Sequence, residues 1–166
     1  MSYPHKSLAS NNMIELDDKF SSTHLWELNY DGALGNTLLH LGAKISDYEL
    51  VTLLLNRGAD VTSMDTCGRT ALHIACEKGS LEIMKLLAEK SPAYILDLPS
   101  DFGHTPLNEA CRCNSPEVVQ LLLSHGSSVD INDVQRYGPL LNAVSNVAEY
   151  ATPIASLLLD AGSNLH

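Results

Sequence analysis

The chain has 166 residues, of which 45% are hydrophobic and 18% are charged, and this composition fits one folded domain rather than a disordered chain. Its 20 acidic and 10 basic residues give a net charge of −10, which argues against nucleic acid and anionic membrane surfaces as partners. No apolar stretch is long enough to cross a bilayer, and residues 1–12 lack the pattern of a secretory signal peptide.

The first thirty residues divide into two parts. Residues 1–12 are mostly polar, and we expect them to be disordered. Residues 13–30 are too apolar for a free tail, so we expect a capping segment that covers the first structural unit, with Trp26 as its anchor. The alternative for the same segment is a peptide that docks on another protein.

Four similar segments follow along the rest of the chain. The first three, Gly35–Ala43, Gly68–Cys76 and Gly103–Cys111, share the pattern Gly-x-Thr-x-Leu, and Arg136–Val144 is a weaker fourth copy. The spacings between equivalent positions, from Thr37 to Thr70, from Thr70 to Thr105 and from Thr105 to Gly138, are 33, 35 and 33 residues. An apolar block follows each segment. A fixed period of this length indicates a repeat protein.

The local pattern of each unit predicts two short antiparallel helices and a turn. Ser46 and Glu49 form the sequence of a capping box, which would open the second helix of the first unit. Ser115-Pro116 and Thr152-Pro153 place a cap residue before a proline, which is typical of a helix start. The glycines expected to end these second helices are Gly58, Gly126 and Gly162.

This period and motif resemble the ankyrin repeat, whose units carry a Thr-Pro-Leu-His-x-Ala signature. The resemblance covers roughly residues 31–166 and implies an all-α solenoid of stacked helix-turn-helix units with protruding β-hairpin-like loops. The repeats would occupy about 31–64, 65–99, 100–132 and 133–166. The resemblance also implies that the threonine and histidine side chains of the motif tie adjacent loops together by hydrogen bonds.

The fourth unit departs from this pattern. Arg136 stands where the glycine belongs, Gly138 replaces the threonine and Leu141 replaces the histidine, so we expect this unit to be looser or to be covered by something else. Terminal repeats normally carry a polar outer face, whereas residues 157–159 are three leucines. This favours a fragment of a longer protein or a C-terminal face that meets a partner. A short natural protein is the alternative.

No catalytic, cofactor-binding or metal site is predicted. The chain lacks the Gly-x-Ser-x-Gly, His-Glu-x-x-His and phosphate-loop motifs. The repeat period alone explains the spacing of His40 and His73. The cysteines contain no Cys-x-x-Cys pair, which indicates reduced thiols in a protein of the cytoplasm or the nucleus. These cysteines are Cys67, Cys76, Cys111 and Cys113.

The resemblance implies a non-enzymatic scaffold that binds another protein through its loop tips and the concave face of its first helices. Phe102 and Tyr137 are our preferred anchors, because aromatic side chains dominate the energetics of interfaces. The alternative is that both rings pack sideways on the neighbouring loop. At the loops, the expected contact residues are Arg69, Asp101, Phe102, His104, Gln135 and Tyr137. On the first helices, they include Lys44, Ile74, Glu77, Lys78, Glu109, Arg112 and Asn142.

Narrower functions remain open. Residues 25–32, Leu-Trp-Glu-Leu-Asn-Tyr-Asp-Gly, resemble the entry to the first repeat of inhibitor-of-NF-kappaB proteins. That resemblance implies a binder of a transcription factor, and the acidic balance favours a partner with a basic surface. The chain departs from that family in having about four units and no recognisable phosphodegron. Two further alternatives are the substrate-recognition module of a ubiquitin ligase and the ankyrin portion of a larger enzyme or channel.

Overall fold

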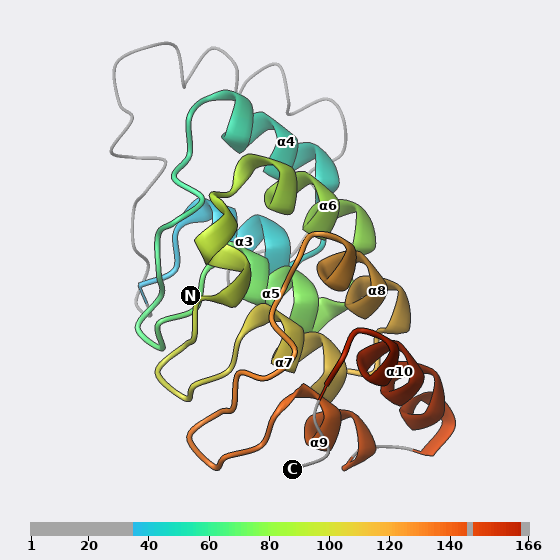
Figure 1. Cartoon of the computed structure of the whole chain (residues 1–166). Helices are drawn as coiled ribbons and strands as arrows, with labels where there is room; N and C mark the ends of the chain where they lie inside the picture. The colour runs from blue at the N-terminus through green and yellow to red at the C-terminus, as the bar shows by residue number, and fades with distance from the viewer. Residues whose placement is uncertain (1–34, 146–147, 164–166) are drawn as a thin grey trace, which may run out of the picture.

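The computed structural model describes residues 35–145 and 148–163, with only the backbone given for residues 148–150 (Figure 1). The predictions for residues 1–12, 13–30 and 25–32 lie outside these residues. The helices form four consecutive pairs, which confirms the predicted all-α repeat architecture. The pairs are α3 (Leu38–Lys44) with α4 (Tyr48–Asn56), α5 (Ala71–Lys78) with α6 (Leu81–Lys90), α7 (Pro106–Arg112) with α8 (Pro116–Ser124), and α9 (Pro139–Val144) with α10 (Ala148–Asp160).

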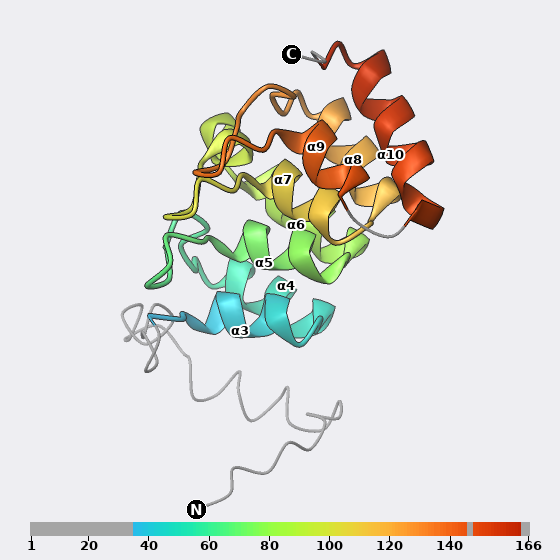
Figure 2. The same cartoon turned by 90° about the horizontal axis from the view of Figure 1, so that it is seen from below.

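The helices lie in two layers. The first helices of the pairs, α3, α5, α7 and α9, stack side by side, and α4, α6, α8 and α10 form the second layer. The long loops between pairs project together from one edge of this stack (Figure 2). Leu39, Leu72 and Leu107 hold the same repeat position and are all fully buried between neighbouring units. Helices of seven to ten residues are too short to be stable alone, so this burial stabilises each unit through its neighbours.

The histidine of the motif ties consecutive loops together, as the resemblance implied. The backbone N–H of Thr70 donates to His73 Nδ1 (3.2 Å), which leaves the proton of the ring on Nε2. That Nε2 donates to the carbonyls of Leu98 (2.9 Å) and His104 (3.1 Å) in the next loop. The first and third repeats make equivalent bonds, from His40 Nε2 to the Arg69 carbonyl (2.8 Å) and from Asn108 Nδ2 to the Ile131 carbonyl (3.2 Å).

The loops also contact each other through their backbones. The N–H of Asp101 donates to the carbonyl of Cys67 (2.9 Å), and the N–H of Val134 donates to the carbonyl of Phe102 (3.0 Å). Among the residues described, no segment forms a strand, so these single bonds take the place of a sheet. The second repeat adds a short 3₁₀ helix, η2 (Ala93–Asp97), which accounts for its longer spacing and was not predicted.

Two of the predicted helix starts are wrong. Helix α4 begins after Asp47, whose carboxylate accepts the N–H of Leu50 (2.9 Å), because Ser46 adopts a left-handed conformation with φ of 56°. The Ser46 hydroxyl instead lies 2.6 Å from the hydroxyl of Ser80. Helix α10 begins at Ala148 and contains Pro153, since the helix-favouring residues before the proline extend it backwards. The predicted start at Ser115-Pro116 is confirmed.

Replacing Asp47 with alanine should lower the free energy of unfolding by about 1 kcal/mol, because the N–H of Leu50 loses its capping acceptor. The Ser46→Ala variant is the matched control, and it should cost clearly less because this hydroxyl caps no helix. Urea denaturation followed by circular dichroism measures both variants. A larger loss for Ser46→Ala would contradict the cap seen here.

Candidate functional site

Residues at two matching positions of the repeats define what we call the inner face. It joins the loop residue before each motif threonine to the last turn of each first helix. The loop residues are Asn36, Arg69, His104 and Tyr137. The helix residues are Lys44, Glu77, Arg112 and Ser145, together with Lys78.

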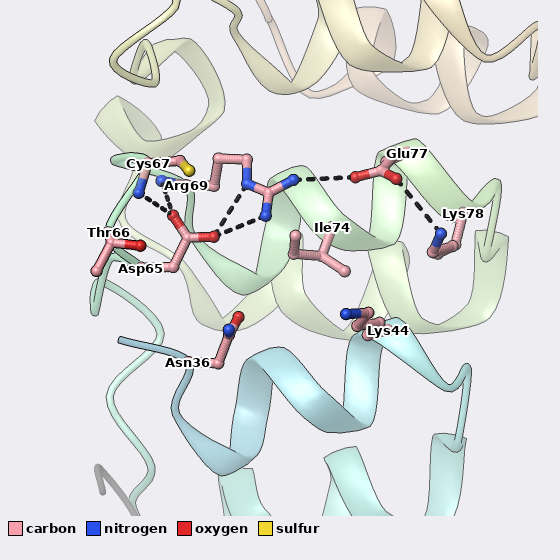
Figure 3. Close-up of a pocket in the computed structure, with 9 residues that line it drawn as sticks. All are labelled: Asn36, Lys44, Asp65, Thr66, Cys67, Arg69, Ile74, Glu77 and Lys78. Atoms are coloured by element: carbon pink, nitrogen blue, oxygen red, sulfur yellow. Dashed lines mark hydrogen bonds and ion pairs between the residues drawn. The ribbon is translucent and has the colours of Figure 1, made fainter. Parts of the chain in front are cut away.

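A chain of charged contacts crosses the inner face at the second repeat (Figure 3). The Arg69 guanidinium contacts the carboxylate of Asp65 through Nη2 (2.8 Å) and Nε (3.0 Å). Its Nη1 reaches Glu77 Oε2 (3.2 Å), and the other oxygen of Glu77 lies 3.3 Å from Lys78 Nζ. These contacts hold a loop side chain against helix α5.

Asp65 anchors this loop. Its Oδ1 accepts the backbone N–H groups of Cys67 (2.8 Å) and Arg69 (2.9 Å). Burial alone would raise the pKa of Asp65, but the hydrogen bonds and the charge of Arg69, with the N–H of Cys67, outweigh it and lower the pKa. Asp133 has the same role in the fourth loop, where it accepts from Gln135 and Tyr137 (2.8 Å each). Sequence reasoning missed this anchor, although an aspartate stands at both positions.

A small pocket lies between the first two repeats, beside this chain of contacts (Figure 3). Its volume is about 160 Å³, and Ile74 contributes apolar surface between the charged groups. Asn36 and Lys44 line it from the first repeat, and Arg69 and Lys78 from the second. The pocket therefore combines two neighbouring units, and its shape depends on their stacking.

A second cluster joins the third and fourth repeats. His104 Nδ1 lies 3.0 Å from Glu109 Oε1, and its Nε2 lies 3.4 Å from Asp133 Oδ2 in the next loop. Arg112 binds the other oxygen of Glu109 through Nη2 (2.7 Å) and Nε (3.0 Å). Burial would raise the pKa of Glu109, but hydrogen bonds and charge from Arg112, and then from His104, lower it. These contacts tie the third loop to helix α7 and to the fourth loop.

The loop tips carry exposed aromatic rings. The side chain of Phe102 is 53% exposed and that of Tyr137 is 41% exposed. The Phe102 ring centre lies 6.4 Å from that of His104, so it leans on its own loop without being covered. Asp101 and Gln135 are also exposed on these two loops.

One position of the repeat, which we expected to contact a partner, is buried in the second, third and fourth units. Asn142 is only 7% exposed, and its side-chain amide donates to the carbonyl of Tyr137 (3.4 Å), so its placement on the exposed surface was wrong. Ile74 and Glu109, which hold the same repeat position, are buried too. The equivalent residue of the first repeat, Leu41, is 41% exposed. Arg69, Glu77 and Lys78 contact one another, and His104 and Arg112 both contact Glu109, while their role as partner contacts stays a prediction.

The outer side of the last repeat is apolar. Leu141, Val144 and Leu159 are 43%, 50% and 45% exposed and line a groove of about 770 Å³. In the second repeat, the positions equivalent to Leu141 and Val144 are His73 and Cys76, which the following repeat buries. The fourth repeat thus exposes a surface that, in the second repeat, is covered by the next unit.

The cysteines have the character of packed side chains. All four are free thiols, and burial raises the pKa of Cys111 to about 12, so this thiol stays protonated at neutral pH. Within residues 35–145 and 148–163, no cluster of three histidine, cysteine or acidic side chains could hold a metal ion. In the same part of the chain, no helix has the length and apolar character required to cross a membrane.

Comparison with known proteins gives a consistent picture. A family model described as ankyrin repeats in three copies matches residues 39–134 and 94–166. The B-cell lymphoma 3 protein of Homo sapiens is 35% identical over 123 residues, covering 72% of this chain and 27% of that protein. Tyrosine-protein kinase HTK16 of Hydra vulgaris is 36% identical over 95 residues, which cover 57% of this chain and 12% of the kinase. Transient receptor potential cation channel subfamily A member 1 of Drosophila melanogaster is 31% identical over 114 residues, covering 67% of this chain and 10% of the channel. The chain therefore spans less than a third of each of these relatives.

Proposed function

Because this chain belongs to the ankyrin-repeat family, a family of non-catalytic interaction modules, we propose that it is a scaffold that binds a partner protein through its loop tips and inner face. The observation that carries this proposal is the pair of exposed rings, Phe102 and Tyr137, on two loops joined by a backbone hydrogen bond. Loops that are held in place lose little conformational freedom on binding, so their aromatic side chains can act as interface anchors.

The charge of the chain supports a partner with a basic surface. Exposed acidic residues occur in all of the first three repeats and at the end of the fourth, among them Glu49, Glu82, Asp101 and Asp160. The net charge of −10 disfavours nucleic acid and anionic lipid in the same way. The free thiols agree with a location in the cytoplasm or the nucleus.

The double variant Phe102→Ala with Tyr137→Ala should lose its partner. Truncating an anchor costs about 2 kcal/mol of binding free energy or more, which is roughly a thirtyfold loss of affinity for one ring alone. The measurement is a crosslinking pull-down from cell lysate, in which proteins captured by the wild type and by the variant are quantified. Circular dichroism must show that the variant stays folded.

The control is Tyr94→Ala, because Tyr94 is an aromatic residue on η2 that is 61% exposed and lies outside the inner face. This variant should capture the partner as the wild type does. Unchanged capture by the double variant would refute the loop tips as the binding site. Attention would then move to residues 13–30 and to the groove of the last repeat.

One of the narrower alternatives is the ankyrin portion of a larger enzyme or channel. The chain is similar to part of a tyrosine-protein kinase and to part of a cation channel. A ubiquitin-ligase module would require the same kind of longer protein. The transcription-factor binder depends on residues 25–32, which the structure does not describe. Sequencing the complete reading frame separates these alternatives from a stand-alone scaffold.

A further inference from the structure

Positive charge is concentrated on the inner face, although the chain is acidic as a whole. Eight basic side chains lie in the residues that the structure describes, and four of them belong to the inner face. Three of those four surround the pocket between the first two repeats. The four are Lys44, Arg69, Lys78 and Arg112.

These cations differ in how far their charge is already neutralised. Arg69 is held by two carboxylates, those of Asp65 and Glu77. Lys78 has a single contact, at 3.3 Å, with a Glu77 oxygen. Lys44 forms no ion pair with any described residue, although it lines the same pocket. The pocket therefore has cationic capacity left after its internal pairs are formed.

We propose that this pocket receives an acidic side chain of the partner, with Lys44 and Lys78 as the groups that bind its carboxylate. This inference rests on the proposed function and specifies the chemistry of the partner at one position. A volume of about 160 Å³ accommodates a carboxylate with a short aliphatic stem. Asn36 also lines the pocket, and its side-chain amide adds a hydrogen-bond donor (Figure 3).

The internal charges favour a carboxylate over other groups. The carboxylate of Glu77 is compensated on both sides, by Arg69 and by Lys78, so an incoming anion meets a neutralised group there. A lysine or arginine of the partner would instead meet Lys44 without a counter-charge. Like charges placed against each other in an interface cost several kcal/mol of binding free energy, so a basic side chain of the partner is disfavoured in this pocket. The partner would thus place an acidic residue at the first two repeats, whatever its charge elsewhere.

The test is selection of binding peptides with the full-length chain as bait. A phage-displayed library of random peptides is the probe, and the enriched peptides are then synthesised and their affinities measured by calorimetry. We expect enriched peptides to share an aspartate or glutamate. Their affinity should fall about tenfold or more for Lys44→Glu with Lys78→Glu, because charge-assisted contacts are lost and repulsion replaces them.

The matched control is Lys85→Glu with Lys90→Glu, which makes the same change of net charge on helix α6 in the second layer. This control should weaken the peptides less than about twofold, since distant surface charges are screened by salt. Circular dichroism of both double variants checks that they fold.

Equal losses in the two double variants would overturn the inference, because bulk charge would then explain the binding. Enrichment of peptides without an acidic residue would overturn it as well. If such peptides are lost in the Phe102→Ala/Tyr137→Ala variant, the proposed scaffold function stands and only the carboxylate pocket fails. If no peptide is enriched, the pocket is refuted, and unchanged capture in the pull-down would refute the scaffold surface separately.

Discussion

Lowering the pH from 7 to 5 should reduce the free energy of unfolding by about 2 kcal/mol through His73 alone. Burial lowers the pKa of His73 to about 4 in the folded protein, whereas an imidazole in the unfolded chain titrates near 6.5. Between these values the unfolded chain binds a proton that the folded chain does not. The stabilisation is therefore fully present above pH 6.5 and is lost as the pH falls towards 4.

Urea denaturation at a series of pH values measures this effect. The chain itself suggests the control variant, because Asn108 occupies the position of His73 in the third repeat and still bonds to the next loop. His73→Asn should therefore flatten most of the pH dependence between 7 and 5. His40, whose pKa burial also lowers, accounts for what remains. Asp65 and Glu109 have lowered pKa values, so their contribution is lost only at lower pH. A wild type equally stable at both pH values would contradict the prediction.

Replacing Gly103 with alanine should lower the free energy of unfolding by about 3 kcal/mol. This glycine has φ of 76°, and an added Cβ would lie 2.7 Å from the backbone nitrogen of Val134 and 2.9 Å from the Cα of Asp133. The fourth loop would have to move away, and the bond from the N–H of Val134 to the Phe102 carbonyl would lengthen.

Gly126 separates the two causes of this loss. It has φ of 88°, but no atom lies within 4 Å of an added Cβ, so Gly126→Ala tests backbone strain without the collision. Its cost should be about 1 kcal/mol. Thermal denaturation of both variants gives the comparison. Equal losses would show that the third and fourth loops are not in close contact.

The repeat period predicted most of the fold. It located the four helix pairs, because the motif recurs in the sequence, and the resemblance to the ankyrin repeat implied the protruding loops and the role of His40 and His73. Arg136, which stands where the glycine of the motif belongs, adopts the left-handed φ of 67° that glycine has in the other loops. Residues that recur at the same position of each repeat therefore allow the fold to be predicted.

What the sequence did not predict lies in local turns and in contacts between neighbouring repeats, which the period does not describe. The left-handed turn at Ser46 moves the N-cap of α4 from Ser46 to Asp47. Serine and aspartate are equally good cap residues, so the sequence does not show which of the two caps the helix. Asn142 looked exposed because the period gives its place along the helix but not the path of the loop above it. The pocket beside Lys44 depends on side chains from two repeats, and only their contacts reveal it.

The ladder of histidine and asparagine bonds stops before the fourth repeat, where Gly138 and Leu141 replace the motif residues. In a stack stabilised only by nearest neighbours, the unit with the fewest ties opens first and closes last. Amide hydrogens of α9 and α10 will therefore exchange with solvent through local openings that leave α5 closed. Tyr137 lies on this unit, so a partner that uses it binds only the closed population. Any loss of stability in the last repeat then lowers the apparent affinity for the partner, even when the contact surface is unchanged.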